Sequence, residues 1–170
     1  MTLGECAAIA TAVVASVFDL HSRRIPNLLT FGAAAAALTV ASLTGGLPGA
    51  GASLTGWLVA TVLWIPIYAL GGMGAGDVKL LAAIGAWLGP ATAVQVSLYS
   101  AIAGGAMAVV VAVARGVARQ TVANVQLLIV HWQVAGFRPH AQLTLATADS
   151  PRLAYAVPIL AGTAVALWLR

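Results

Sequence analysis

The sequence has very little charge. Of its 170 residues, eight are Lys or Arg and four are Asp or Glu, so charged side chains make up only 7% of the chain. A soluble globular domain usually carries about a quarter charged residues, and this chain therefore lacks the polar side chains needed to face water on all sides. Hydrophobic residues make up 61%, without the alternation typical of an outer-membrane barrel. We therefore expect an all-α, polytopic integral membrane protein with about six transmembrane helices.

Other absences exclude whole classes of function. The single cysteine, Cys6, excludes an internal disulfide and any Cys-pair zinc site. The basic residues are scattered singly or in pairs, with no basic stripe and no interleaved aromatic residues, so nucleic-acid binding is not indicated. Glu5 is the only charge in the first apolar run, and no cleavable signal peptide is expected. His131 and His140 have no accompanying acidic ligand, so we expect no metal, and no cofactor is predicted.

Glycine and proline divide the apolar sequence into segments of membrane-spanning length. A turn is expected at residues 45–49 (GGLPG), and a break at Gly89-Pro90, with Pro90 in the first turn of the helix that follows. The predicted spans are residues 3–20, 28–43, 53–70, 91–114 and 153–169, with a short helix over 78–88 that does not cross a full hydrocarbon layer.

Residues 120–137 carry no charge but hold several Gln, Asn and His side chains. Val122, Val125, Ile129 and Trp132 recur at helical spacing on one side, which favours an amphipathic helix lying on the membrane surface over a further crossing. We expect one membrane-embedded domain over residues 1–170, in which 120–150 is a cytoplasmic or interfacial segment.

The basic residues predict the orientation of the chain. When the helix over 78–88 is counted with these five spans as a sixth crossing, seven of the eight lie on one side and only Arg170 lies on the other. Cytoplasmic loops carry the excess of Lys and Arg in membrane proteins. Both termini are therefore expected outside the cytoplasm. The seven are Arg23, Arg24, Lys79, Arg115, Arg119, Arg138 and Arg152.

Two of the four acidic residues are candidates for chemistry. Glu5 is expected to be an interfacial charge and Asp149 a loop or helix-terminal carboxylate. Asp19 ends the first span and Asp77 follows the third, so both reach the cytoplasmic side and can meet there. Acidic residues at membrane depth are costly and by default indicate function.

Paired carboxylates are what aspartic proteolysis requires. One must be ionised to deprotonate a water molecule while the other stays protonated. The alternatives are structural: Asp77 pairing with Lys79 or capping its helix, and Asp19 pairing with Arg23 or Arg24. On residue types alone, both interpretations stay open.

The surrounding sequence resembles a known family. The string Gly74-x-Gly76-Asp77 is the motif of membrane-embedded GxGD aspartic proteases. The longer string GMGAGDVKL at residues 72–80, preceded by Asp19 and by RIPN at 24–27, closely resembles type IV prepilin peptidases. Residues 151–159 (PRLAYAVPI) are similar to the final helix of that family. The resemblance covers nearly all of the chain except residues 120–150.

This resemblance implies an aspartic leader peptidase with Asp19 and Asp77 as the catalytic dyad. It implies a bacterial inner-membrane protein that cleaves the short basic leader of prepilin or pseudopilin precursors at the cytoplasmic face, with pilus-assembly machinery as a further partner. The chain resembles the short form associated with tight-adherence (Flp) pili. Larger members of that family also N-methylate the new N-terminus and have a cytoplasmic domain with Cys-pair motifs. This sequence has neither that domain nor those cysteines, so the resemblance leaves N-methylation open.

Three residues near the motif are candidates for supporting roles. Gly74 and Gly76 allow a close backbone approach next to Asp77, and Lys79 could tune the dyad or bind a substrate carbonyl. Arg23 and Arg24 are assigned to topology, since they would repel a basic leader inside the site. The alternative class is a non-enzymatic transporter or secretion component, although transporters usually place ionisable groups near the midplane. An archaeal preflagellin-type peptidase would apply the same chemistry to another substrate.

Overall fold

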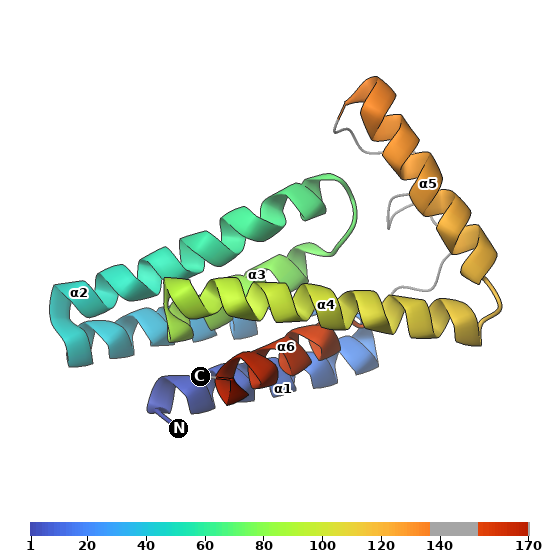
Figure 1. Cartoon of the computed structure of the whole chain (residues 1–170). Helices are drawn as coiled ribbons and strands as arrows, with labels where there is room; N and C mark the ends of the chain where they lie inside the picture. The colour runs from blue at the N-terminus through green and yellow to red at the C-terminus, as the bar shows by residue number, and fades with distance from the viewer. Residues whose placement is uncertain (137–152, 170) are drawn as a thin grey trace.

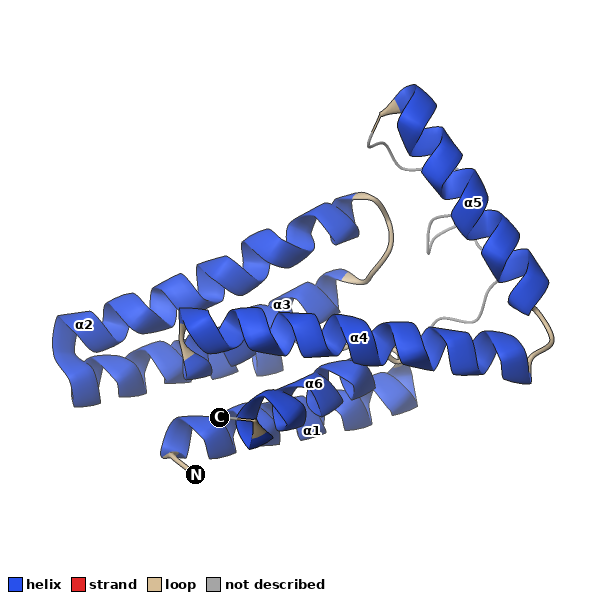
Figure 2. Cartoon of the chain, viewed as in Figure 1, coloured by secondary structure: helices blue, strands red, loops and turns tan. Residues whose placement is uncertain are grey.

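The computed structural model describes residues 1–136 and 153–169, and in this part of the chain every regular element is an α-helix (Figures 1 and 2). This confirms the predicted all-α class. The helices are α1 (Leu3–Ser22), α2 (Asn27–Ala69), α3 (Ala75–Leu88), α4 (Pro90–Ala114), α5 (Ala118–Ala135) and α6 (Ala156–Trp168).

Helix α2 folds back on itself to form two antiparallel arms (Figure 1). The arms meet at Gly46, whose φ of 60° and ψ of −147° are not helical. A positive φ costs glycine little, because glycine has no Cβ. The reversal falls within the turn predicted at residues 45–49, and the two arms correspond to the predicted spans 28–43 and 53–70.

Helix α3 is the centre of the bundle and contacts α1, α2, α4 and α6. Its side chains Leu80, Leu81 and Ile84 are completely buried or nearly so. The second arm of α2 approaches α3 at Gly56 and Gly85, where a Cβ on either glycine would overlap the carbonyl of the other. Close packing of this kind stabilises helix pairs in membranes, where the lipid is as apolar as the side chains.

Helix α6 packs against both α1 and α4 (Figure 1). The prediction for α6 was too long, since the helix begins at Ala156 rather than at residue 153. Pro158 explains the later start: near the beginning of a helix its missing N–H needs no partner, whereas further inside it would break a hydrogen bond. The 13 residues of α6 span about 20 Å at 1.5 Å per residue.

Helix α5 leaves the bundle and, among the described helices, contacts only α4 (Figure 1). A helix was predicted over 120–137, and α5 confirms it with a start two residues earlier. Its position on a membrane surface stays a prediction. The rest of the predicted segment, together with Arg138, His140, Asp149 and Arg152, lies outside the described residues.

Three of the described helices, α1, α2 and α4, are long and apolar enough to cross a membrane, and α6 is a shorter apolar helix. The end of α1, the start of α3, the end of α4 and the start of α6 lie at one end of the bundle (Figure 1). The N-terminus and the end of α6 lie at the opposite end. The fold therefore brings the elements that carry Asp19 and Asp77 to the same end.

Candidate active site

Asp19 lies in the last turn of α1 and is only 7% exposed. Its Oδ2 accepts a hydrogen bond of 3.1 Å from the backbone N–H of Ala156, the first residue of α6. Helix α1 ends at Ser22 and is capped by Arg23, which adopts the left-handed conformation with φ of 55°. The N–H of Arg23 donates to the Asp19 carbonyl at 3.0 Å. Asp19 is thus held between the end of one helix and the start of another.

Asp77 lies in the first turn of α3, because the helix begins at Ala75 and not at residue 78 as predicted. The Asp77 Oδ2 accepts a hydrogen bond of 3.2 Å from the N–H of Gly74. This contact is the helix cap that we considered as a structural role, so Asp77 does serve the start of its helix. Only one of its two oxygens is engaged in this contact, and the other remains available for chemistry.

The two carboxylates share a cavity of about 320 Å³ at the end of the bundle. The charge of Asp19 acts electrostatically on Asp77 across this space. Two carboxylates in one poorly solvated cavity are costly to ionise together, and we therefore expect only one of them to be charged at a time. Asp19 and Asp77 therefore line one cavity, in agreement with the expectation from the number of spans that precede each.

The glycines of the motif act by allowing close contacts. A Cβ on Gly76 would lie 3.3 Å from the Cβ of Ile25, in the segment that joins α1 to α2. A Cβ on Gly74 would lie 3.1 Å from Asp77 Oδ2. Both contacts are tighter than ordinary van der Waals packing, so glycine at these positions keeps α3 against the α1–α2 connection and leaves room for the carboxylate.

Lys79 also lines the cavity, and its amino group is held by α2. Its Nζ donates to Asn27 Oδ1 at 2.9 Å and lies 5.2 Å from the centre of the Phe31 ring. A cation over an aromatic face is attracted by the ring quadrupole. Lys79 therefore ties the start of α3 to the start of α2 across the cavity.

The family model for type IV leader peptidases matches residues 6–109, a stretch that includes both Asp19 and Asp77. The chain belongs to the type IV leader peptidase family.

Two curated relatives, the prepilin leader peptidase/N-methyltransferases of Burkholderia pseudomallei strains 1026b and K96243, are each 38% identical to it over 116 residues. The matched part is 63% of this chain and 36% of each relative, so the chain spans about a third of the length of these relatives. No solved structure matches.

Several residues that line the cavity of Asp19 and Asp77 in this leader peptidase were not predicted from the sequence. Arg23 and Arg24 were assigned to topology, yet both line the cavity. Their direction depends on the left-handed turn at Arg23, which no local pattern announces. Asn27 lines the cavity too, at the end of the RIPN string that carried the resemblance.

The segment just before α6 is the other omission. Ala156 contributes a backbone donor, which leaves no signal in side-chain patterns. Its neighbour Tyr155 packs edge-on against Trp64 with ring centres 6.0 Å apart, and interacts electrostatically with Asp77. Only the resemblance of residues 151–159 to the final helix of the family pointed to this segment.

Glu5 is remote from the site and has a structural contact. Its carboxylate accepts from the N–H of Thr2 at 2.8 Å, and the Thr2 hydroxyl accepts from the N–H of Glu5 at 3.3 Å. This capping box stabilises the start of α1. Within residues 1–136 and 153–169, no three His, Cys, Asp or Glu side chains lie together in an arrangement that could hold a metal ion.

Proposed function

We propose that the chain is a membrane-embedded aspartic endopeptidase that removes the short basic leader of prepilin-like precursors, including those of Flp pili. The observation that carries the proposal is the meeting of Asp19 and Asp77, far apart in the sequence, at one cavity. The family match supports the substrate class, and the name of the curated relatives, prepilin leader peptidase, points the same way.

The geometry suits a two-carboxylate mechanism. Each aspartate has one oxygen on a backbone N–H, from Ala156 or from Gly74, which fixes its orientation. The ionised carboxylate takes a proton from a water molecule as the water oxygen attacks the scissile carbonyl carbon. The protonated carboxyl group gives its proton to the carbonyl oxygen. When the resulting gem-diol intermediate collapses, the C–N bond breaks and the leaving amine takes the proton that the first carboxyl group received from water. A hydroxyl group of the intermediate returns its proton to the second carboxylate, which restores the starting state.

The cationic rim limits where the leader can lie. Arg23, Arg24 and Lys79 line the cavity together with the two carboxylates. They would repel a basic leader placed deep in it, so only the residues next to the scissile bond enter the cavity. The basic part of the leader then stays outside, in the water of the cytoplasm.

Cleavage of a defined precursor tests this function. The purified protein is incubated in membranes with a full-length prepilin, and the N-terminus of the product is sequenced. A new N-terminus directly after the leader is the expected result, and Asp77→Asn should give none although it changes size and shape very little. Equal cleavage by a well-inserted Asp77→Asn variant would refute an aspartic mechanism.

The proposal includes the cytoplasmic face of a bacterial inner membrane as the place of cleavage. The helix ends that carry Arg23, Lys79 and Arg115 lie at one end of the bundle, as the positive-inside rule requires. Cysteine labelling at positions 23 and 115 should therefore report the same membrane face, and position 2 the other. Labelling that places positions 23 and 115 on opposite faces contradicts the topology.

A further inference from the structure

Ala156 is held by α1 at both of its backbone groups. It is the first residue of α6, so its N–H has no partner within that helix, and Asp19 Oδ2 accepts from it at 3.1 Å. The carbonyl oxygen of Ala156 accepts from the hydroxyl of Ser16 at 3.0 Å. Because Ala156 is fully buried, water cannot replace either partner. The orientation of the Asp19 carboxylate therefore depends on where the N–H of Ala156 lies.

Tyr155 sets the direction of this N–H. The peptide bond is planar, so the N–H of Ala156 lies in one plane with the Cα and the carbonyl group of Tyr155. Any movement of Tyr155 is therefore passed to the donor of Asp19 through the backbone, without an intervening side chain.

The ring of Tyr155 is held by helices other than α1. It packs edge-on against Trp64 of α2, with ring centres 6.0 Å apart and planes at 65°. Its hydroxyl donates to the carbonyl oxygen of Ser100 on α4 at 3.4 Å, which is long for a hydrogen bond between oxygen atoms. Packing of the ring, more than the hydroxyl, therefore fixes the start of α6 against α2 and α4.

Gly104 of α4 makes room for the Tyr155 ring. A Cβ at position 104 would lie 2.6 Å from Tyr155 Cε2 and 2.7 Å from Cζ, whereas carbon atoms in contact are about 3.5–4.0 Å apart. A side chain here would thus push the ring away by roughly 1 Å. The next residue, Gly105, is exposed, and a Cβ there would have no atom within 4 Å. Of these two adjacent glycines, packing requires only Gly104.

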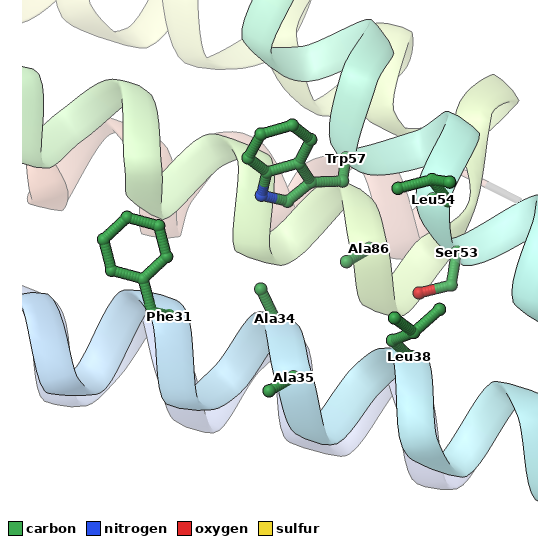
Figure 3. Close-up of a pocket in the computed structure, with 8 residues that line it drawn as sticks. All are labelled: Phe31, Ala34, Ala35, Leu38, Ser53, Leu54, Trp57 and Ala86. Carbon is green, nitrogen blue, oxygen red and sulfur yellow. The ribbon is translucent and has the colours of Figure 1, made fainter.

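This tight fit is not a general property of the bundle. Between the two arms of α2 and α3 a cavity of about 420 Å³ remains, with Ala34, Ala35 and Ala86 among the residues that line it (Figure 3). A larger side chain at those positions would enter open space, whereas at Gly104 a single methyl group meets the Tyr155 ring. The place of this ring is therefore closely defined by its surroundings.

We propose that Tyr155 is a positioning residue for cleavage: its ring, packed on Gly104 and Trp64, directs the Ala156 N–H toward Asp19. This inference rests on the proposed peptidase function. Misplacement of a reacting group by about 1 Å can cost roughly 100-fold in rate. Neither Tyr155 nor Gly104 lines the cavity that holds the two carboxylates, so a displaced ring should lower kcat and leave KM unchanged.

The two glycines of α4 allow a matched test, with rates of precursor cleavage normalised to the folded fraction. Gly104→Ala should lower kcat by about tenfold or more without a change in KM, and Gly105→Ala should match the parent. Equal kcat values for the two variants would overturn the proposal, and so would a loss that lies mainly in KM. If the parent does not cleave the precursor, the proposed function fails and this inference fails with it.

Changes at Tyr155 separate the ring from the hydroxyl. Tyr155→Phe keeps the ring and should cleave like the parent, whereas Tyr155→Leu should lose about tenfold or more in kcat. A loss in Tyr155→Phe as large as that in Tyr155→Leu would assign the effect to the hydroxyl and overturn the proposal.

A double variant tests whether Gly104 acts through the ring. Leucine lacks Cε2, Cζ and the hydroxyl, the atoms that a Cβ at position 104 would overlap. Adding Gly104→Ala to Tyr155→Leu should therefore cost little further activity. Losses that multiply would show that the two residues act independently, which contradicts the proposal.

Hydrogen exchange tests the same contact without relying on activity. The Ala156 amide has Asp19 as its hydrogen-bond acceptor, so its residue-resolved exchange rate reports on that contact. Exchange of this amide should be faster in folded Gly104→Ala than in the parent and unchanged in Gly105→Ala. An unchanged rate in Gly104→Ala would overturn the positioning role while leaving the proposed peptidase function intact.

Discussion

The two ends of the helix bundle satisfy their polar groups in different ways. At the end that carries the N-terminus, Glu5 and Thr2 bond to each other three residues apart, and the chain reverses at Gly46 and Gly89. At the opposite end Asp19 accepts from Ala156, 137 residues away, and Lys79 donates to Asn27, 52 residues away. One end uses neighbours in the sequence, whereas the other combines such a neighbour contact, from Gly74 N–H to Asp77, with partners that only the complete fold supplies.

This difference indicates which acids were placed for chemistry. A capping box forms within a single helix and needs no tertiary structure. An acidic residue at membrane depth is costly to keep, and Asp19 on α1 and Asp77 on α3 line one cavity because α1, α3 and α6 contact one another. Variants that act on one end and not on the other therefore test the comparison.

The largest expected effect comes from Asp19→Asn. The amide keeps the size of the side chain but cannot take a proton from water, so precursor cleavage should fall by several orders of magnitude. Glu5→Gln is the matched change at the other end and should keep most of the activity. Rates of precursor processing, normalised to inserted protein, measure both; a comparable loss in Glu5→Gln would break the comparison.

A smaller loss is expected from Ala156→Pro, which removes the N–H that Asp19 accepts. Proline is tolerated at the first position of a helix, but Tyr155 before it has an αR backbone and Ala156 is fully buried, so rates are normalised to the folded fraction measured by thermal unfolding. Misplacement of a reacting group by about 1 Å can cost roughly 100-fold, and we expect a loss of this order in kcat with little change in KM. Ser16→Ala is the control: the Ser16 hydroxyl donates to the carbonyl oxygen of Ala156 at 3.0 Å, and its removal should cost far less activity. Equal losses in both variants would mean that packing, not the donor, matters.

The sequence predicted those parts of the fold that have local causes. The reversal near Gly46 and the break at Gly89-Pro90 follow from glycine and proline themselves. The meeting of Asp19 and Asp77 followed from counting crossings, which requires only the number of spans. What could not be predicted depends on tertiary structure. The donor to Asp19 is the backbone N–H of Ala156, and Arg23 and Arg24 line the cavity after a left-handed turn at Arg23 that no local pattern predicts.

The smallest effect on chemistry is expected from Gly56→Ala. The added Cβ would overlap the Gly85 carbonyl and push α2 away from α3, which should destabilise the protein by about 1–3 kcal/mol. The fraction that is folded should cleave normally, because the cavity is formed by other residues. Thermal unfolding in detergent gives the stability and active-fraction kinetics give the rate; a lower rate per folded molecule would link this contact to the site.

The central claim is that Asp19 and Asp77 act as one unit, and a double-variant comparison tests it most directly. Precursor cleavage is measured for the parent, Asp19→Asn, Asp77→Asn and the double variant, each confirmed as inserted. If the two carboxylates share one proton and one water molecule, each single change removes the whole mechanism, and the double variant should be little slower than either single variant. Losses that multiply, so that the double variant is slower by the product of the two single effects, would show that the two residues act independently and would contradict the account.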